Sequence, residues 1–297
     1  MPKTSKCQVD LEVLTNIIIM ENKTILPSEK ATHVGVVRSP VGNEHAIVDR
    51  ISAHRRAIFS VLQTGLARSH NGNPHASIRI ETIFGTSVLV SGLASLVLSK
   101  KEVDTLSHHF KIHLERLLRL NQACPSPLVF FAAGCPPFPG LLHTRMLSLF
   151  GQLCRLRSGD NILARHALTI YSSTSPSSKS WFWQIRDICL QYDLPHPLQW
   201  LENPPEKVSM KKDVKCAIHS YWLQKLRTDA EKLKSLRFLR TNYLGLTKCH
   251  PIYRTCQSSP WEISKAQVQL RLLSGRYRLE TLTKYWQSDK SGNCILG

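Results

Sequence analysis

The sequence predicts a mainly α-helical fold with a small amino-terminal β-hairpin. From residue 43 onward, apolar residues recur at spacings of three and four, which is the periodicity of amphipathic helices. Runs of β-branched residues of the kind found in strands occur within the first forty residues. The chain has 297 residues and is 42% hydrophobic, enough for two or three modules with cores of their own.

The strand signal consists of three short runs, Ile17–Met20, Thr24–Leu26 and His33–Val37. Polar residues and Pro27 separate them, as expected of a hairpin or ribbon. A hairpin of this size is not stable alone, so we expect residues 1–42 to be the remainder of a larger sheet.

Three helices are predicted next, over residues 43 to about 65, about 76 to 98 and about 100 to 121, with Ser99 as the N-cap of the third. We expect them to pack as one bundle, residues 43–123. In the first of them, Arg50, Arg55 and Arg56 lie away from the apolar face, where a solvated surface and phosphate contact are equally plausible roles.

A Pro-rich passage from 124 to 139 predicts a boundary, and a helix over about 140 to 157 follows it, giving a connector of residues 124–171. The Ser-rich run at 172–180 predicts a linker. The remaining region, 181–297, begins with Trp181-Phe182-Trp183, three aromatic residues for which a place in the core is favoured over stacking on bases.

The charge is concentrated near the carboxy terminus. The whole chain carries 39 Lys and Arg against 21 Asp and Glu, and residues 205–297 alone carry 18 against 7. This balance favours a polyanionic partner, either nucleic acid or an anionic membrane face. A helix over about 206 to 237 places Lys207, Lys211 and Lys215 on one face, which suits either a phosphate backbone or a solubilising surface. A last helix should stop at Gly275, with Arg271, Arg276 and Arg278 around its end.

Catalytic motifs are absent from the sequence. It has no Asp-Asp pair for a two-metal site, no Gly-Lys-Ser/Thr box and no Gly-x-Ser-x-Gly elbow. Cys216-x2-His219, Cys249-His250 with Cys256, and the trio His108, His109 and His113 lack the paired spacing of structural zinc sites. We therefore expect no cofactor and no metal.

The nine scattered cysteines predict reduced thiols without disulfides, and the first residues lack the apolar stretch of a signal peptide. The apolar run Ile83–Leu98 has only about 16 residues, whereas a membrane-spanning helix needs about 20. These features predict an intracellular protein, nuclear or cytoplasmic, without a membrane partner.

Four segments, in order, resemble reverse transcriptases of non-LTR (LINE-type) retrotransposons. Ala31–Ser39, containing His-Val-Gly-Val-Val, resembles the closing hairpin of the palm. Ile80–Leu96 resembles a thumb helix, with Ser91-Gly92 where the family usually has Tyr-Gly. Lys101–Leu120 is similar to the next thumb helix, and Val268–Arg278 to the basic stretch before a terminal Cys/His knuckle, whose first cysteine would be Cys294.

The resemblance implies the end of a palm, a thumb and a connector. The Tyr-x-Asp-Asp box and the earlier catalytic Asp would precede Met1, and the knuckle would be completed after Gly297, so the chain should not polymerise by itself. It implies binding of RNA or DNA, as a primer–template duplex, through phosphates, and a full-length retroelement protein as a further partner. The alternatives are a helical protein-interaction module and a relic reading frame with no cellular role. The residues expected to contact phosphates are Arg50, Arg55, Arg56, Lys207, Lys211, Lys215, Arg271, Arg276 and Arg278.

Overall fold

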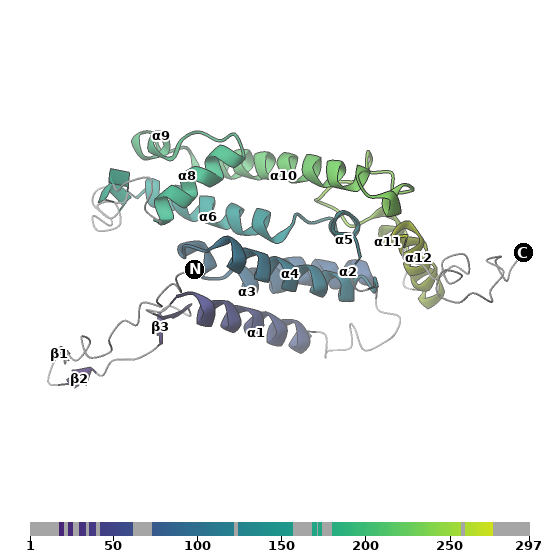
Figure 1. The fold of residues 1–297 in the computed structure, drawn as a ribbon, viewed down its shortest axis with the longest axis horizontal. Helices are drawn as coiled ribbons and strands as arrows, with labels where there is room; N and C mark the ends of the chain where they lie inside the picture. The colour runs from purple at the N-terminus through teal and green to yellow at the C-terminus, as the bar shows by residue number, and fades with distance from the viewer. Residues whose placement is uncertain are drawn as a thin grey trace, which may run out of the picture.

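The structure, a computed structural model, confirms the mainly α-helical class with a small amino-terminal β component (Figure 1). It describes residues 18–20, 23–25, 30–33, 36–39, 42–61, 73–121, 124–156, 168–170, 172–173, 180–256 and 259–275.

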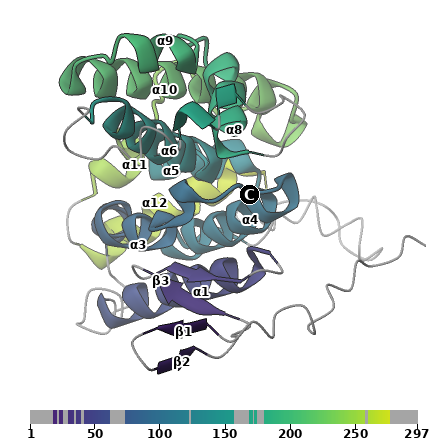
Figure 2. The same ribbon diagram turned by 90° about the vertical axis from the view of Figure 1, so that its left-hand side faces the viewer.

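The β component is two separate hairpins. Strand β1 (Ile18–Met20) pairs antiparallel with β2 (Lys23–Ile25), and β3 (Ala31–His33) pairs antiparallel with β4 (Val36–Arg38). The β3–β4 hairpin lies beside helix α1 (Glu44–Val61), as Figures 1 and 2 both show. The first two predicted strands are present within a residue, and the strands form two small sheets. The third predicted run, His33–Val37, is not one strand, because it is divided between the end of β3 and the start of β4, which pair with each other.

The second predicted helix is composite. Helix α2 (Pro74–Ile80) runs into the π-helical segment η3 (Glu81–Gly85) and then α3 (Thr86–Val90). The prediction that it continues to residue 98 is wrong, because Gly92 has a φ of 75° and turns the chain before the 3-10 segment η4 (Leu93–Ser95).

Helix α4 (Lys100–Leu117) confirms the predicted cap. The Ser99 hydroxyl accepts from the Glu102 amide at 3.4 Å, and the Ser99 amide donates to the Glu102 carboxylate at 2.6 Å. This reciprocal pair satisfies two backbone donors that the helix leaves open, which explains why the helix begins there.

The remaining helices are α5 (Ser126–Ala133), α6 (Phe138–Cys154), α8 (Trp181–Gln191), α9 (Pro197–Glu202), α10 (Lys207–Glu231), the 3-10 segment η5 (Lys234–Leu236), α11 (Pro251–Arg254) and α12 (Pro260–Leu273). Helix α10 ends six residues before the predicted residue 237, and η5 follows it. Helix α12 ends just before Gly275, whose φ of 63° matches the predicted stop.

The helices lie in layers, with α1 on one side, α3 and α4 next, then α5 and α6, and α10 on the opposite side (Figure 1). One hydrophobic core runs from Ala46 to Leu270, so the segments on either side of the predicted boundaries share it. Phe182 is fully buried against Phe150, whereas Trp181 and Trp183 are partly buried against the same core, so of the three predicted core aromatics only Phe182 lies fully inside.

Within the described residues, no helix combines the length and apolarity needed to cross a bilayer. The seven cysteines described, from Cys124 to Cys256, are all free thiols.

Candidate functional site

The predicted phosphate contacts on α1 and α10 lie on opposite layers of the molecule (Figure 1). Arg55 and Arg56 are exposed on α1, whereas Arg50 is half-buried and its guanidinium pairs with the carboxylate of Asp49. Lys207, Lys211 and Lys215 are exposed along the first half of α10. We call these three residues the α10 stripe.

Arg271 contacts the protein itself. Its Nε and Nη2 donate to the backbone carbonyl of Arg119 at 3.2 and 3.0 Å, just beyond the end of α4. It thereby ties α12 to α4. Arg276 and Arg278 lie outside the described residues. The predicted cations therefore do not gather on one surface.

A different set of cations shares a cleft. Arg79 of α2, Lys248 of the loop before α11, and Arg254 of α11 line a hollow of about 430 Å³. All three residues are exposed, and none of the residues described as lining this cleft is acidic. We call it the basic cleft.

Gly134 shapes one wall of the basic cleft. It ends α5 with a φ of 68°, and a Cβ placed there would overlap the backbone carbonyl of Lys248. The next two residues bind the same helix end, because the His250 amide and the Cys249 thiol both donate to the carbonyl of Ala132, at 3.0 and 2.9 Å. The backbone around Lys248 is thus held tightly against α5.

Residues 232–261, the segment that contributes Lys248 and Arg254 to the basic cleft, contain six Lys and Arg and no Asp or Glu. The same segment carries three exposed aromatic residues, Phe238, Tyr243 and Trp261, which are 65%, 59% and 70% exposed. Arg227 of α10 donates to the carbonyls of Asn242 and Leu244 at 3.1 and 3.3 Å, which holds the loop that carries Tyr243.

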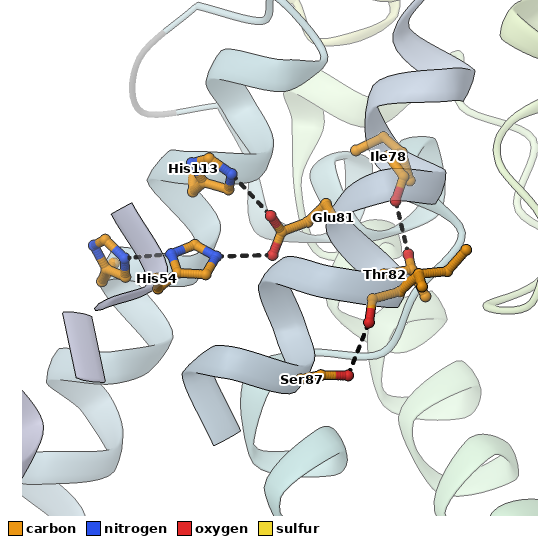
Figure 3. A network of polar contacts seen from close by, with 8 residues as sticks. His54, Ile78, Glu81, Thr82, Ser87 and His113 are labelled. Carbon is orange, nitrogen blue, oxygen red and sulfur yellow. Dashed lines mark hydrogen bonds and ion pairs between the residues drawn. The ribbon is translucent and has the colours of Figure 1, made fainter. Parts of the chain in front are cut away.

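A second arrangement is buried between α1, η3 and α4. His54 Nε2 lies 3.0 Å from Glu81 Oε1, and His113 Nε2 lies 2.9 Å from Glu81 Oε2. Figure 3 shows the two imidazole rings pointing at the carboxylate from different helices. His54 Nδ1 is also 3.0 Å from His109 Nε2. We call His54, Glu81 and His113 the His–Glu cluster.

The surroundings keep Glu81 ionised and His109 neutral. Burial alone would raise the pKa of Glu81, but its contacts with His113 and His54 outweigh burial and lower the pKa to about 2. The pKa of His109 is lowered to about 4, chiefly by burial and further by the charges of His54 and Arg55.

Space for the Glu81 carboxylate comes from Gly85, one turn further along. A Cβ at Gly85 would overlap Glu81 Oε2 and lie 2.6 Å from Ile58 Cδ1, so a side chain there would displace the carboxylate. Beside the cluster is a cavity of about 470 Å³, whose lining includes His109, His113 and Arg55.

The sequence pointed to His113, but only in a trio with His108 and His109 on one helix. His54 and Glu81, its partners in space, are not among the candidate residues that the sequence predicts. The available signal was Glu81 itself, a carboxylate directly after Ile80 and just before the apolar run that begins at Ile83. In the part of the chain that the structure describes, the His–Glu cluster is the group whose donor atoms converge as metal ligands would, and the Cys216 and Cys249 half-sites do not.

Comparisons with protein-family models, curated proteins and solved structures give no match for this chain. They therefore neither support nor oppose the resemblance to reverse transcriptases.

Proposed function

We propose that the protein binds nucleic acid through the phosphate backbone, and that the basic cleft is its main contact. The observation that carries the proposal is that Arg79, Lys248 and Arg254, from three separate segments, face one hollow with no acidic residue among its described lining. Three cations around one cleft can pair with neighbouring phosphates of a nucleic-acid backbone. Each such contact releases condensed counterions, which favours binding.

The exposed aromatic rings of residues 232–261, the segment that also carries Lys248 and Arg254, favour single-stranded or splayed nucleic acid. Exposed rings in a basic region give bases a surface to stack on, which is the usual way of binding unpaired strands without reading their sequence. Phe238 lies under the Arg237 guanidinium at 4.6 Å and Trp261 under the Lys265 ammonium at 5.3 Å, so two of the three exposed rings adjoin a cation.

The resemblance to the thumb and connector of non-LTR reverse transcriptases supports the same proposal, because that part of the enzyme holds the primer–template. Under this proposal the chain is a non-catalytic binder of retroelement origin, since the sequence has no Asp-Asp pair. The α10 stripe of Lys207, Lys211 and Lys215 is proposed as a second, weaker contact. Its middle residue, Lys211, lies about 30 Å along the helix from the carboxy-terminal residue of α10, Glu231.

The test is a salt titration of binding, measured by fluorescence anisotropy with labelled single-stranded RNA, single-stranded DNA and an RNA–DNA duplex. We expect the logarithm of the affinity to fall linearly with the logarithm of salt, by roughly 0.7–0.9 for each phosphate contact. The triple variant Arg79→Gln, Lys248→Gln, Arg254→Gln should lose roughly tenfold or more in affinity and about 2–3 units of slope.

The matched control is Lys207→Gln, Lys211→Gln, Lys215→Gln, which removes the same charge from α10. We expect it to reduce affinity less than the cleft variant does. Equal losses would mean that net charge acts alone and would reject the cleft as a site. If the unaltered chain shows no salt-dependent binding to any of the three probes, the function itself is rejected in favour of a protein-interaction module.

A further inference from the structure

We propose that His54, Glu81 and His113 bind a divalent transition-metal ion, with Zn²⁺ as the best match. The proposal is independent of nucleic-acid binding, because the cluster lies between α1, η3 and α4, and none of its three residues lines the basic cleft.

The positions of the donor atoms support it. One donor atom from each residue lies within 4.8 Å of the others, and the two imidazole-to-carboxylate distances are 3.0 and 2.9 Å. Ligands about 2.0–2.2 Å from a tetrahedral ion are themselves roughly 3.3 Å apart, so small adjustments would admit the ion.

The donor types select the class of ion. Two imidazole nitrogens and one carboxylate form a donor set common for Zn²⁺ and neighbouring transition metals, whereas Ca²⁺ and Mg²⁺ prefer oxygen ligands alone. The three ligands come from three different helical segments. The side chains of His54, Glu81 and His113 are 0%, 1% and 13% exposed, so an ion there would be shielded from bulk water.

Two atoms of the cluster have only each other as partners in the part of the chain that the structure describes. Glu81 Oε2 and His113 Nε2 are buried and lie 2.9 Å apart. Neither atom has another hydrogen-bond partner among the described residues. Buried polar atoms with few partners are costly, and a shared metal ion would coordinate both atoms at once.

His109 is placed to hold the ring of His54, one of the proposed ligands, in a fixed orientation. With the ion on His54 Nε2, the His54 Nδ1–H would donate to His109 Nε2, 3.0 Å away. Such a bond fixes the tautomer and ring orientation of a metal-binding histidine.

A fourth ligand could come from the cavity beside the cluster. His113 and His109 line the cavity of about 470 Å³, which would supply a water molecule as fourth ligand and a route for the ion. The π-helical turn Glu81–Gly85 is consistent with this role, because π-turns inside helices often occur at functional sites.

The experiment measures metal binding by the full-length chain, produced without a histidine tag and stripped with a chelator. Zn²⁺ is titrated by calorimetry, and Co²⁺ is added separately to record its visible absorption, which is strong when the ion is tetrahedral. We expect about one ion per chain, a tetrahedral Co²⁺ spectrum, and a rise in the unfolding temperature with free Zn²⁺.

Three variants and one control locate the ion. Glu81→Gln and His113→Gln should abolish binding, and His109→Ala should weaken it by roughly 10–100-fold while retaining the Co²⁺ spectrum. The control is His108→Gln, an exposed histidine on the same helix that lines the same cavity; it should bind like the unaltered chain.

Circular dichroism checks that each variant is folded, and the conservative Glu81→Gln keeps the shape of the side chain if other changes prevent folding. Binding that persists unchanged in folded His113→Gln would place the ion elsewhere, at the cysteines for instance, and would overturn the proposal. So would the absence of Zn²⁺ binding by the unaltered chain at micromolar concentrations.

Discussion

The His–Glu cluster and the basic cleft each take one charged side chain from the same stretch of helix, but the cluster buries its charge whereas the cleft exposes its charge. Arg79 and Glu81 are two residues apart, yet Arg79 is exposed in the cleft, whereas Glu81 is 1% exposed inside the bundle. A charge can stay buried only with partners close by, so the cluster is closed around Glu81. The cleft cations remain in water and are available to a partner.

This contrast predicts that charge removal has different consequences in the two regions. Glu81→Ala should destabilise the protein by about 3–5 kcal/mol, because it removes the partner of two buried histidines. Urea unfolding at neutral pH measures the change. Glu231→Ala, at an exposed carboxylate, is the control and should change the stability by less than about 0.5 kcal/mol. A loss below about 1 kcal/mol for Glu81→Ala would show that the cluster is not a coupled network.

Acid should affect the two regions over different pH ranges. Near the cleft, burial lowers the pKa of His250 to about 4 from an ordinary value of 6.5. The unfolded chain then takes up a proton that the folded chain refuses, so stability falls as the pH drops from about 6.5 to 4, by up to about 1.4 kcal/mol per pH unit. Glu81, with its pKa lowered to about 2, loses its contribution only between about 4.5 and 2.

His250→Asn isolates the first of these ranges. His250 caps α11 by accepting from the Ile252 amide at 3.2 Å, and Asn can accept in the same way without titrating. Unfolding curves at pH 7.5, 6 and 4.5 should show the stability of the variant declining less steeply than that of the unaltered chain. Parallel declines would contradict the assignment.

Gly134 offers a way to disturb the cleft through the core. Gly134→Ala places a side chain against the Lys248 carbonyl at a left-handed backbone position, which should cost about 1–3 kcal/mol. It should also weaken nucleic-acid binding by moving Lys248. Gly245→Ala, which meets open space, is the matched control and should affect neither property. Thermal unfolding and the anisotropy assay together measure both effects.

The smallest expected change in stability is at the cleft itself. Arg254→Gln should alter the free energy of unfolding by less than about 0.5 kcal/mol, because the side chain is exposed, while reducing the salt slope of nucleic-acid binding by about 1. A clear destabilisation would show that Arg254 is part of the packed structure and would remove the contrast between the two regions.

Local features of the fold were predictable because their causes are local. The Ser99 cap of α4 depends on a carboxylate three residues away, and the stop at Gly275 on a backbone angle that glycine adopts easily. The early end of the helix before Gly92 was missed, since the apolar pattern continues past the residue whose left-handed angle turns the chain.

The candidate sites were less predictable. The cationic character of the carboxy-terminal third was visible in the sequence, but Arg79, which completes the basic cleft, lies more than 150 residues earlier. Arg271, predicted to contact phosphates, instead donates to the Arg119 carbonyl, a contact across 152 residues. Composition counts charges without specifying which side chains meet.

The sequence by itself determined the helical class, the Ser99 cap of α4, the stop at Gly275 and the excess of positive charge, because periodicity, capping and composition act within a few residues. Only the tertiary structure decided that His54 and His113 meet Glu81 and that Arg79 meets Lys248 and Arg254. The physical reason is that helix packing brings these residues together, and packing depends on how whole apolar faces fit one another across the shared core.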